Sequence, residues 1–448
     1  MPESPFLFFF DPILRGPTLG SMMMCLAASL VGVLMFLRKQ SLVGEVLSHA
    51  AYPGVIFGVI VAGLLALDDN MELNITLLIM CGASLSALIG LWTVHLLEFK
   101  LKIRADSALC FVLSTFFGIG VVLASDVQFS YTSLYRQAQA YLYGQAATMT
   151  DIHIALYGIL SLIVVVTIIL FDKELQTIIF APDYAKSLGI NVNFINAIIF
   201  FLTVLAVIIG IRSVGVILMS AMFIAPAVAA RQYTNRFHMM LILAAFFGLL
   251  SGYFGNYLSV LGTYQLSSSN MMTRLILPTG PMIVIVASAI CILSLLFAPE
   301  RGLLYRIFRI VKFRYQCARE NIMKSLWKLG QNQTLSFAQI AQYQSASQLY
   351  LKYILLTLVY SGWLVKMGAD SYQLTSDGFL RAARIVRLHR LWEVYLADYL
   401  GAGADHVHHN AEEMEHIITP ELENELTLLL KDPQIDPHQQ WIPPKDGI

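Results

Sequence analysis

Charged residues are scarce in this chain of 448 residues. Only 13% of the residues are Asp, Glu, Lys or Arg, and 57% are hydrophobic, whereas a soluble domain carries about 25% charged residues. This scarcity excludes an ordinary soluble protein and predicts several membrane-spanning helices. The 29 basic and 29 acidic residues balance. Net charge therefore indicates nothing about partners, and only the positions of the charges are informative.

Two further absences limit the chemistry. The five cysteines include no C-x-x-C pair, so we expect neither a disulfide framework nor a thiolate metal site. The chain also lacks a G-x-x-x-x-G-K-[ST] loop and has not even one Gly-Lys dipeptide. We therefore expect no nucleotide on this chain. It should not be an enzyme, because ATP hydrolysis would come from a separate ATPase subunit.

Long apolar runs fill the first two thirds of the chain. A membrane-spanning helix needs about 20 apolar residues, and nine runs approach this length. They cover residues 18–37, 46–67, 73–97, 107–125, 152–171, 194–211, 213–230, 238–262 and 278–298. The second contains Pro53, and only residues 210–212 separate the sixth from the seventh. The sequence predicts an all-α polytopic membrane bundle of about nine transmembrane helices.

Basic residues fall on alternate connections between these runs. Because basic residues collect on the cytoplasmic side of a membrane, they predict an N-terminus outside and a cytoplasmic chain after residue 300. We expect the protein in the cell inner (cytoplasmic) membrane. The residues that follow the rule are Arg38, Lys39, Lys100, Lys102, Arg104, Lys173, Lys186, Arg231, Arg236, Arg301, Arg306, Arg309, Lys312 and Arg314, against the exceptions Arg136, Arg212 and Arg274.

Composition changes sharply after Phe297. We predict a permease domain over residues 1–298 and a basic, partly amphipathic linker over 299–318, of the kind that lies on a membrane surface. A cytoplasmic winged helix-turn-helix should follow over 319–380, and a helical metal-sensing and dimerisation domain over 381–448.

The stretch RKQSLVGEVLSHAAYPGV, residues 38–55, places two ionisable side chains at an apolar run. Glu45 and His49 are four residues apart, so on a helix they share one face, roughly 5–6 Å apart. A carboxylate and an imidazole facing the same way form half of a divalent metal site, and ionisable groups at membrane depth are usually functional. In the alternative interpretation, Glu45 lies at the cytoplasmic boundary and His49 hydrogen-bonds a neighbouring helix.

Five ordered stretches resemble the membrane permeases of zinc, manganese and iron ABC importers. They are residues 38–55, AYLYGQ (140–145), FAPDYAKSLGI (180–190), SVGVILMSAMFIAPAVAA (213–230) and PTGP (278–281). The resemblance implies that Glu45, where Asp is commoner, and His49 contact the passing metal. It also implies three partners: an ABC ATPase subunit, an extracytoplasmic metal-binding protein and a second permease subunit, the same or homologous.

Residues 180–190 lie on a predicted cytoplasmic connection. The resemblance implies that they form a coupling helix on the ATPase, with Asp183, Ala185 and Gly189 as its pattern. A short helix projecting from the membrane can transmit an ATP-driven rotation as a rigid-body movement. Without the resemblance, a solvated loop is the simpler interpretation.

Residues 319–380 predict a winged helix-turn-helix. After a first helix, residues 335–344 and 345–362 form a helix pair, and residues 363–378 form two short strands around residues 368–370, the wing. The side chains expected to face DNA are Ser347, Gln348, Tyr350, Lys352 and Tyr353. Lys352 is the one basic residue of this helix, so its phosphate affinity would be modest. A protein-binding winged helix and buried tyrosines are the alternatives.

The tail contains DHVHHNAEEMEHI, residues 405–417, which is rich in the side chains that bind divalent cations. Glu412 and His416 are four residues apart, with Glu415 beside them, and His389 and Glu393 form another such pair on the preceding predicted helix. Such pairs share a helical face. Alone, an E/H-rich helix is more often an exposed charged surface.

From about residue 319 the chain resembles DtxR/MntR-type metal-dependent repressors. The resemblance implies manganese-type ligands at His389, Glu412, Glu415 and His416, and an ancillary iron-type site at Glu393 and His408. Glu412 stands where iron-type sensors have Cys, so oxygen and nitrogen donors favour Mn²⁺ or Fe²⁺ over Zn²⁺. Asn321 and Lys324 stand where the first helix should supply an acidic or Met ligand, which would weaken or change the site. His406 and His409 match no ligand.

Together the two halves predict a divalent-metal permease fused to a sensor of the imported metal. We expect the sensor to bind a DNA operator as a homodimer, and we expect proteolytic release in the linker near residues 301–318. In the alternative, the tail never binds DNA and instead gates transport. A membrane sensor without transport fits the permease stretches poorly.

Overall fold

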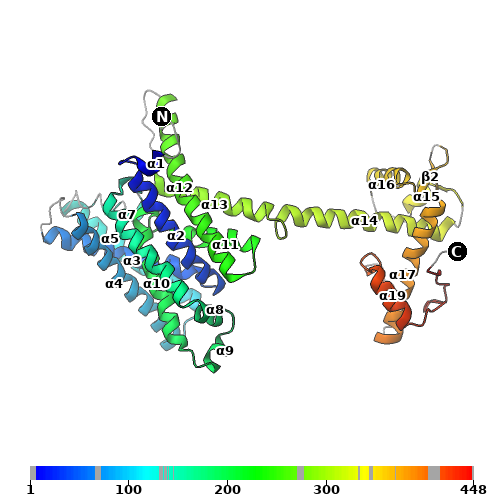
Figure 1. Ribbon diagram of the computed structural model, residues 1–448, viewed down its shortest axis with the longest axis horizontal. Helices are drawn as coiled ribbons and strands as arrows, with labels where there is room; N and C mark the ends of the chain where they lie inside the picture. Colours follow the sequence, from blue (N-terminus) through cyan, green and yellow to red (C-terminus); the bar gives the residue numbers. More distant parts are fainter. Residues whose placement is uncertain are drawn as a thin grey trace. The chain divides into compact units, whose positions relative to one another are not determined.

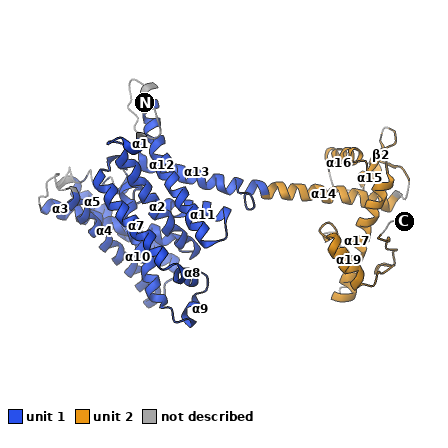
Figure 2. Ribbon diagram, viewed as in Figure 1, with its two compact units in different colours: residues 1–305 blue, residues 306–448 orange. Residues whose placement is uncertain are grey.

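The computed structural model describes residues 7–65, 72–130, 135, 139, 141–144, 146–269, 277–330, 333–342, 347–368, 370–401 and 414–445. The chain forms two compact units, residues 1–305 and residues 306–448 (Figure 2). Each has its own apolar core. The border between them falls inside one helix, α14 (Leu303–Gly330).

All the regular secondary structure described in unit 1 is helical (Figure 1). Eight helices in the described part are long and apolar enough to cross a membrane. They are α2 (Arg15–Leu37), α3 (Ser41–Leu64), α4 (Glu72–His95) with its continuation η2 (Leu96–Lys100), α5 (Ala105–Ser130), α7 (Asp151–Leu170), α10 (Val192–Val214), α12 (Phe237–Ser269) and α13 (Thr279–Phe297). The short elements are α1 (Leu7–Phe10), η3 (Ala146–Thr148), α8 (Asp172–Phe180) and α9 (Pro182–Ser187).

The seventh predicted span differs from the structure. Helix α11 (Met219–Tyr233) has 15 residues and is about 22 Å long, less than the roughly 30 Å of a hydrocarbon core. The helix begins late because the chain turns at Gly215, whose φ is +91°. A Cβ there would lie 2.6 Å from the backbone of Gly144, so only glycine fits. The apolar run 213–230 therefore forms a turn and a short buried helix.

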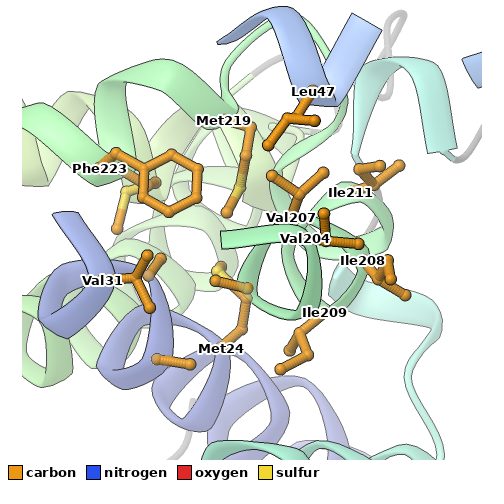
Figure 3. Packing of buried hydrophobic residues seen from close by; sticks show 14 of the residues in the cluster. Met24, Val31, Leu47, Val204, Val207, Ile208, Ile209, Ile211, Met219 and Phe223 are labelled. Atoms are coloured by element: carbon orange, nitrogen blue, oxygen red, sulfur yellow. The ribbon is translucent and has the colours of Figure 1, made fainter. Parts of the chain in front are cut away.

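Glycine lets the helices of unit 1 approach one another closely. A Cβ on Gly32 of α2 would lie 2.1 Å from the carbonyl oxygen of Phe223 on α11. Gly54 of α3 and Gly82 of α4 face each other in the same way. Around these contacts, side chains from α2, α3, α10 and α11 meet in one apolar cluster that includes Leu47 (Figure 3).

Unit 2 combines helices with a small antiparallel sheet. After α14 come β1 (Leu335–Ser336), α15 (Phe337–Gln342), α16 (Gln348–Tyr360), β2 (Leu364–Lys366), β3 (Ser371–Leu374), α17 (Ser376–Leu400) and α19 (Pro420–Leu429). The strand order is β1-β3-β2. This is the order of elements that the winged-helix prediction requires, with strands β2 and β3 as the wing.

Local sequence signals fix the long helix of unit 2. Thr375 precedes α17, and its hydroxyl accepts a hydrogen bond from the Gly378 N–H, as an N-cap does. Gly401 ends the helix with a left-handed φ of +63°, the usual role of glycine at a helix C-terminus. Between these caps, α17 presents His389 and Glu393 to the interior.

Candidate metal sites

The predicted pair of the permease lies on α3. His49 is buried, with 9% of its surface exposed, and Glu45 is half-buried on the same helical face one turn earlier. The His49 ring packs edge-on against Phe117, with ring centroids 4.8 Å apart. Its Nδ1 is buried and has no hydrogen-bond partner in the described residues. The predicted alternative, a hydrogen bond from His49 to a neighbouring helix, is therefore not made through Nδ1.

Pro53 leaves a second polar atom of His49, its backbone carbonyl oxygen, without the usual helical hydrogen bond. Proline has no backbone N–H, so it cannot donate to the carbonyl oxygen four residues earlier, which is that of His49. The imidazole Nδ1 of His49 therefore has no hydrogen-bond partner in the described residues, and its backbone carbonyl lacks the usual helical donor. Together with the Glu45 carboxylate, this gives α3 nitrogen and oxygen donors of the kind that bind Mn²⁺, Fe²⁺ or Zn²⁺.

The predicted coupling segment forms a helical corner made of α8 and α9 (Figure 1). Pro182 begins α9, Ala185 is fully buried, and Gly189 ends it at φ +77°. Two apolar side chains of this corner, Tyr184 and Leu188, are exposed. The segment is thus a capped helix with an exposed apolar surface rather than the solvated loop of the alternative interpretation.

In unit 2, buried carboxylates and imidazoles alternate along one line. Glu393 Oε1 lies 3.2 Å from His389 Nε2, and His389 Nδ1 lies 2.5 Å from Glu415 Oε2. Glu415 Oε1 lies 3.5 Å from His416 Nε2, and His416 Nδ1 lies 2.6 Å from Glu320 Oε2. The structure therefore joins four predicted ligands from α17 and the segment after residue 413.

Two residues of α14 complete this line, and the sequence prediction did not assign either as a ligand. Glu320 is one, as the partner of His416. Lys324 is the other: its Nζ lies 2.9 and 2.8 Å from the two oxygens of Glu415 and 3.3 Å from His389 Nδ1. The available signal was the spacing, because residues 320 and 324 share one face of a helix.

The charged groups in this cluster shift one another's pKa values. Burial disfavours the imidazolium of His389, but its hydrogen bonds with Glu393 and Glu415 outweigh burial and raise the pKa of His389 above its ordinary value. Burial also opposes the carboxylate of Glu415, yet the hydrogen bond from His389 and the charge of Lys324 lower the pKa of Glu415. The structure thus favours an ionised Glu415 held between two cations.

The donor types suit a hard divalent cation, but the arrangement does not hold one. Among the described residues, no three His, Cys, Asp or Glu side chains are placed to bind a metal ion. The Lys324 ammonium donates to both oxygens of Glu415. Two predicted ligands, Glu412 and His408, lie outside the described residues. The six predicted ligands therefore stay a prediction.

Three arginines of α17 hold the C-terminal part of unit 2. Arg384 pairs with Glu423 of α19 at 2.8 Å. Arg387, fully buried, donates to the carbonyl of Pro443 at 2.8 Å, and Arg390 donates to the side chain of residue 440 at 2.6 Å. The sequence prediction assigned these residues no role, although their spacing of three places them along one side of the helix.

The predicted DNA-facing residues lie on or just before α16. Ser347, at the N-cap, and Gln348 are exposed. Tyr350 and Tyr353 are exposed as well, at 39% and 56%, so the alternative of buried tyrosines is wrong. Lys352 is exposed, and its ammonium lies 5.3 Å from the centroid of the Phe337 ring.

A cavity of about 610 Å³ opens beside the buried cluster of unit 2. Its lining includes Glu320, Glu415 and His416 together with Arg381 and Arg384 of α17.

Parts of both units match known protein families. Residues 11–298 match the ABC 3 transport family, and residues 375–444 match the iron dependent repressor, metal binding and dimerisation domain. The chain belongs to the ABC 3 transport family. As a member of it, this permease is not an enzyme, and the ATPase of such a transporter is a separate subunit.

Relatives of this ABC 3 permease cover most of its length. A probable metal transport system membrane protein of Chlamydia trachomatis is 35% identical over 443 residues, 97% of each chain. The manganese transport system membrane protein MntC of Bacillus subtilis is 30% identical, covering 88% of this chain and 86% of its own. Among solved structures, PsaBC from Streptococcus pneumoniae covers 67% of this chain and 96% of its own, with TM-score 0.53 and 25% identity.

Proposed function

We propose that the chain is the membrane permease of an ABC importer for a divalent metal, with Mn²⁺, Fe²⁺ and Zn²⁺ as candidates. The observation that carries the proposal is the donor set of α3. His49 is buried with an unpaired Nδ1, its carbonyl lies opposite Pro53, and Glu45 is on the same face. The names of relatives, which include manganese and metal transport proteins, agree with this substrate class.

Metal uptake tests the permease proposal. The chain would be expressed with its ATPase and binding protein in cells that lack their own manganese importer. We expect His49→Ala and Glu45→Gln to abolish uptake, because each removes a donor from the path. Asp106→Asn, which neutralises an exposed carboxylate on α5, is the matched control. Undiminished uptake by both α3 variants would contradict the proposal.

We also propose that the chain lies in the inner membrane with its N-terminus outside, and that the corner α8–α9 binds the ATPase. The exposed Tyr184 and Leu188 support this, since apolar side chains displayed next to a buried Ala185 offer a docking surface. Tyr184→Glu should lower uptake and release the ATPase from the purified complex, while Lys173→Glu in α8 should not. An extracytoplasmic metal-binding protein and a second permease, the same or homologous, complete the complex.

For unit 2 we propose a metal-responsive repressor that binds operator DNA through α16 as a homodimer. Its exposed Gln348, Tyr350 and Lys352 support a role in contacting a groove. The full chain in lipid nanodiscs would be titrated against DNA from upstream of its own operon, with chelator and then with Mn²⁺, Fe²⁺ or Zn²⁺. Sequence-dependent binding that Gln348→Ala removes is the expected result. No binding with any metal would refute repression.

Proteolytic release would free the repressor from the membrane. Most of the basic stretch near 301–318 lies on the first turns of α14, which begins at Leu303, and residues 303–314 are exposed. Immunoblots of cells grown with and without metal would show a fragment of roughly a third of the chain. Full-length protein alone under every metal condition would contradict release.

A second candidate function is supported by the charge of α16. Lys352 is the one basic residue of that helix, and its ammonium already lies over Phe337, which favours a domain that gates transport over one that binds DNA. A chain truncated near residue 315 distinguishes the two. Gating requires that truncation abolish the inhibition of uptake by internal metal, whereas repression leaves the kinetics of transport unchanged.

A further inference from the structure

The cation at the centre of the buried cluster in unit 2 is the ammonium of a lysine side chain. Lys324 lies on α14 with only 8% of its side chain exposed, and Glu415 opposite it is fully buried. The Lys324 ammonium donates to both Glu415 oxygens, at 2.8 and 2.9 Å. A bidentate contact of this kind is how a carboxylate also receives a metal ion.

The neighbours of Lys324 are the side chains that the sequence predicts as metal ligands. Its Nζ lies 3.3 Å from His389 Nδ1, and Glu415 itself is 2.5 Å from that same nitrogen. The two predicted ligands from different segments thus converge on the lysine. A divalent ion between Glu415 and His389 would lie within van der Waals distance of a positive charge, which is strongly unfavourable in a site with little water.

We infer that Lys324 is a tethered cation that occupies the metal position between Glu415 and His389. A divalent ion binds there only when it displaces the ammonium, so Lys324 sets the metal affinity of the unit. The inference rests on the proposed metal response of unit 2. A cavity lies beside Glu320, Glu415 and His416, next to this position.

Removal of the ammonium should strengthen metal binding. Lys324→Gln abolishes the competing charge while it retains a polar side chain of similar length, and Lys324→Met does so with an apolar one. Because the lysine makes two charge-assisted hydrogen bonds that the ion must replace, we expect binding at least roughly tenfold tighter in both variants. Lys366→Gln, at an exposed lysine of β2, changes the net charge equally and should have no effect.

Manganese titration of the full chain tests this. The chain in lipid nanodiscs would be titrated with Mn²⁺, and unbound Mn²⁺ would be measured by electron paramagnetic resonance. Metal bound in the permease is the same background in every variant. The expected result is one additional tight site in Lys324→Gln and Lys324→Met, absent from Lys366→Gln and lost again in Lys324→Gln/Glu415→Gln. Amide exchange of α14 would verify that each variant is folded.

The other outcomes separate this inference from the proposed function. If the unaltered chain and both Lys324 variants bind Mn²⁺ in unit 2 with equal affinity, the tethered-cation inference is wrong and metal sensing stands. If none of them binds more Mn²⁺ than the Glu415→Gln variant, both the inference and the metal response of unit 2 are wrong.

Discussion

The charge of Glu415 should be a large contributor to the stability of unit 2. Its carboxylate is the shared partner of two cations, Lys324 at 2.8 Å and His389 at 2.5 Å, and its side chain is fully buried. Glu415→Gln preserves the shape of the side chain and removes its charge. The Lys324 ammonium then stays buried without a counter-ion and His389 keeps only Glu393, whereas Lys324→Met leaves Glu415 still paired with His389.

Because the two substitutions leave different charges unpaired, they should differ in their cost in free energy of unfolding. Loss of one partner from a buried ion pair costs about 3–5 kcal/mol, and we expect Glu415→Gln to cost that much. Lys324→Met removes two charge-assisted hydrogen bonds but also ends the burial of an ammonium, so about 1–2 kcal/mol is expected. In the double variant no unpaired ammonium remains, so its cost should lie below the sum of the two, with a coupling energy of about 1–2 kcal/mol.

Hydrogen exchange of the full chain measures these values locally. Amides of α14 near Lys324 and of α17 near His389 report the free energy of opening of unit 2. A loss of about 3 kcal/mol corresponds to exchange roughly 150 times faster. Lys366→Met, at an exposed lysine of β2, is the control and should leave exchange unchanged. A cost below about 1 kcal/mol for Glu415→Gln, or strictly additive costs, would refute the shared-partner argument.

Three further predictions concern other parts of the chain. Burial, followed by the charge of Glu320, raises the pKa of Cys317 to about 11 from the ordinary thiol value of 9.0. Alkylation of Cys317 at pH 8 should therefore be about 100-fold slower than that of an ordinary thiol. The Glu320→Gln variant should be alkylated faster. Arg387→Met leaves buried acceptors of the C-terminal segment unpaired and should cost about 3–5 kcal/mol, seen as faster amide exchange over residues 420–443. Gly32→Ala forces α2 away from α11 and should lower the melting temperature in detergent by a cost of about 1–3 kcal/mol, whereas Gly118→Ala, with no atom within 4 Å of the added Cβ, should not.

The membrane half was predictable because its signal is long and repetitive. A run of about 20 apolar residues forms a helix regardless of which neighbour it packs on. The exception was residues 213–230, where Gly215 turns the chain at φ +91°. Apolar composition alone does not show such a turn, because it depends on the close approach of Gly144, which is distant in sequence.

The winged-helix unit was predictable for a related reason. Each of its elements carries a local signal, such as the Thr375 N-cap of α17 or Gly368 at φ +86° between β2 and β3. The sequence predicted Tyr350 and Tyr353 as groove-facing but left their burial open as the alternative, because either face of α16 can be buried at that composition. Only the packing of α16 against the core of unit 2 decides it.

The buried cluster shows where prediction from sequence ended. Spacing identified His389 with Glu393, and Glu412 with His416, as pairs on shared faces. The family resemblance identified Lys324 as a departure from the expected ligand. It could not show that Lys324 points at Glu415, because residues 324 and 415 are 91 positions apart and meet only through the fold.

That contact changes what the departure means. A lysine at a ligand position could have pointed to solvent and left a weaker site with one donor fewer. Instead, the ammonium is buried on the carboxylate that the metal would use. A buried cation of this kind is retained only with its counter-ion, so Lys324 and Glu415 stabilise the unit together in the absence of metal. The same pair that stabilises unit 2 therefore opposes metal binding. Because the metal must displace the ammonium, the site fills only when metal is abundant, whereas a site without the lysine would fill at low metal concentration.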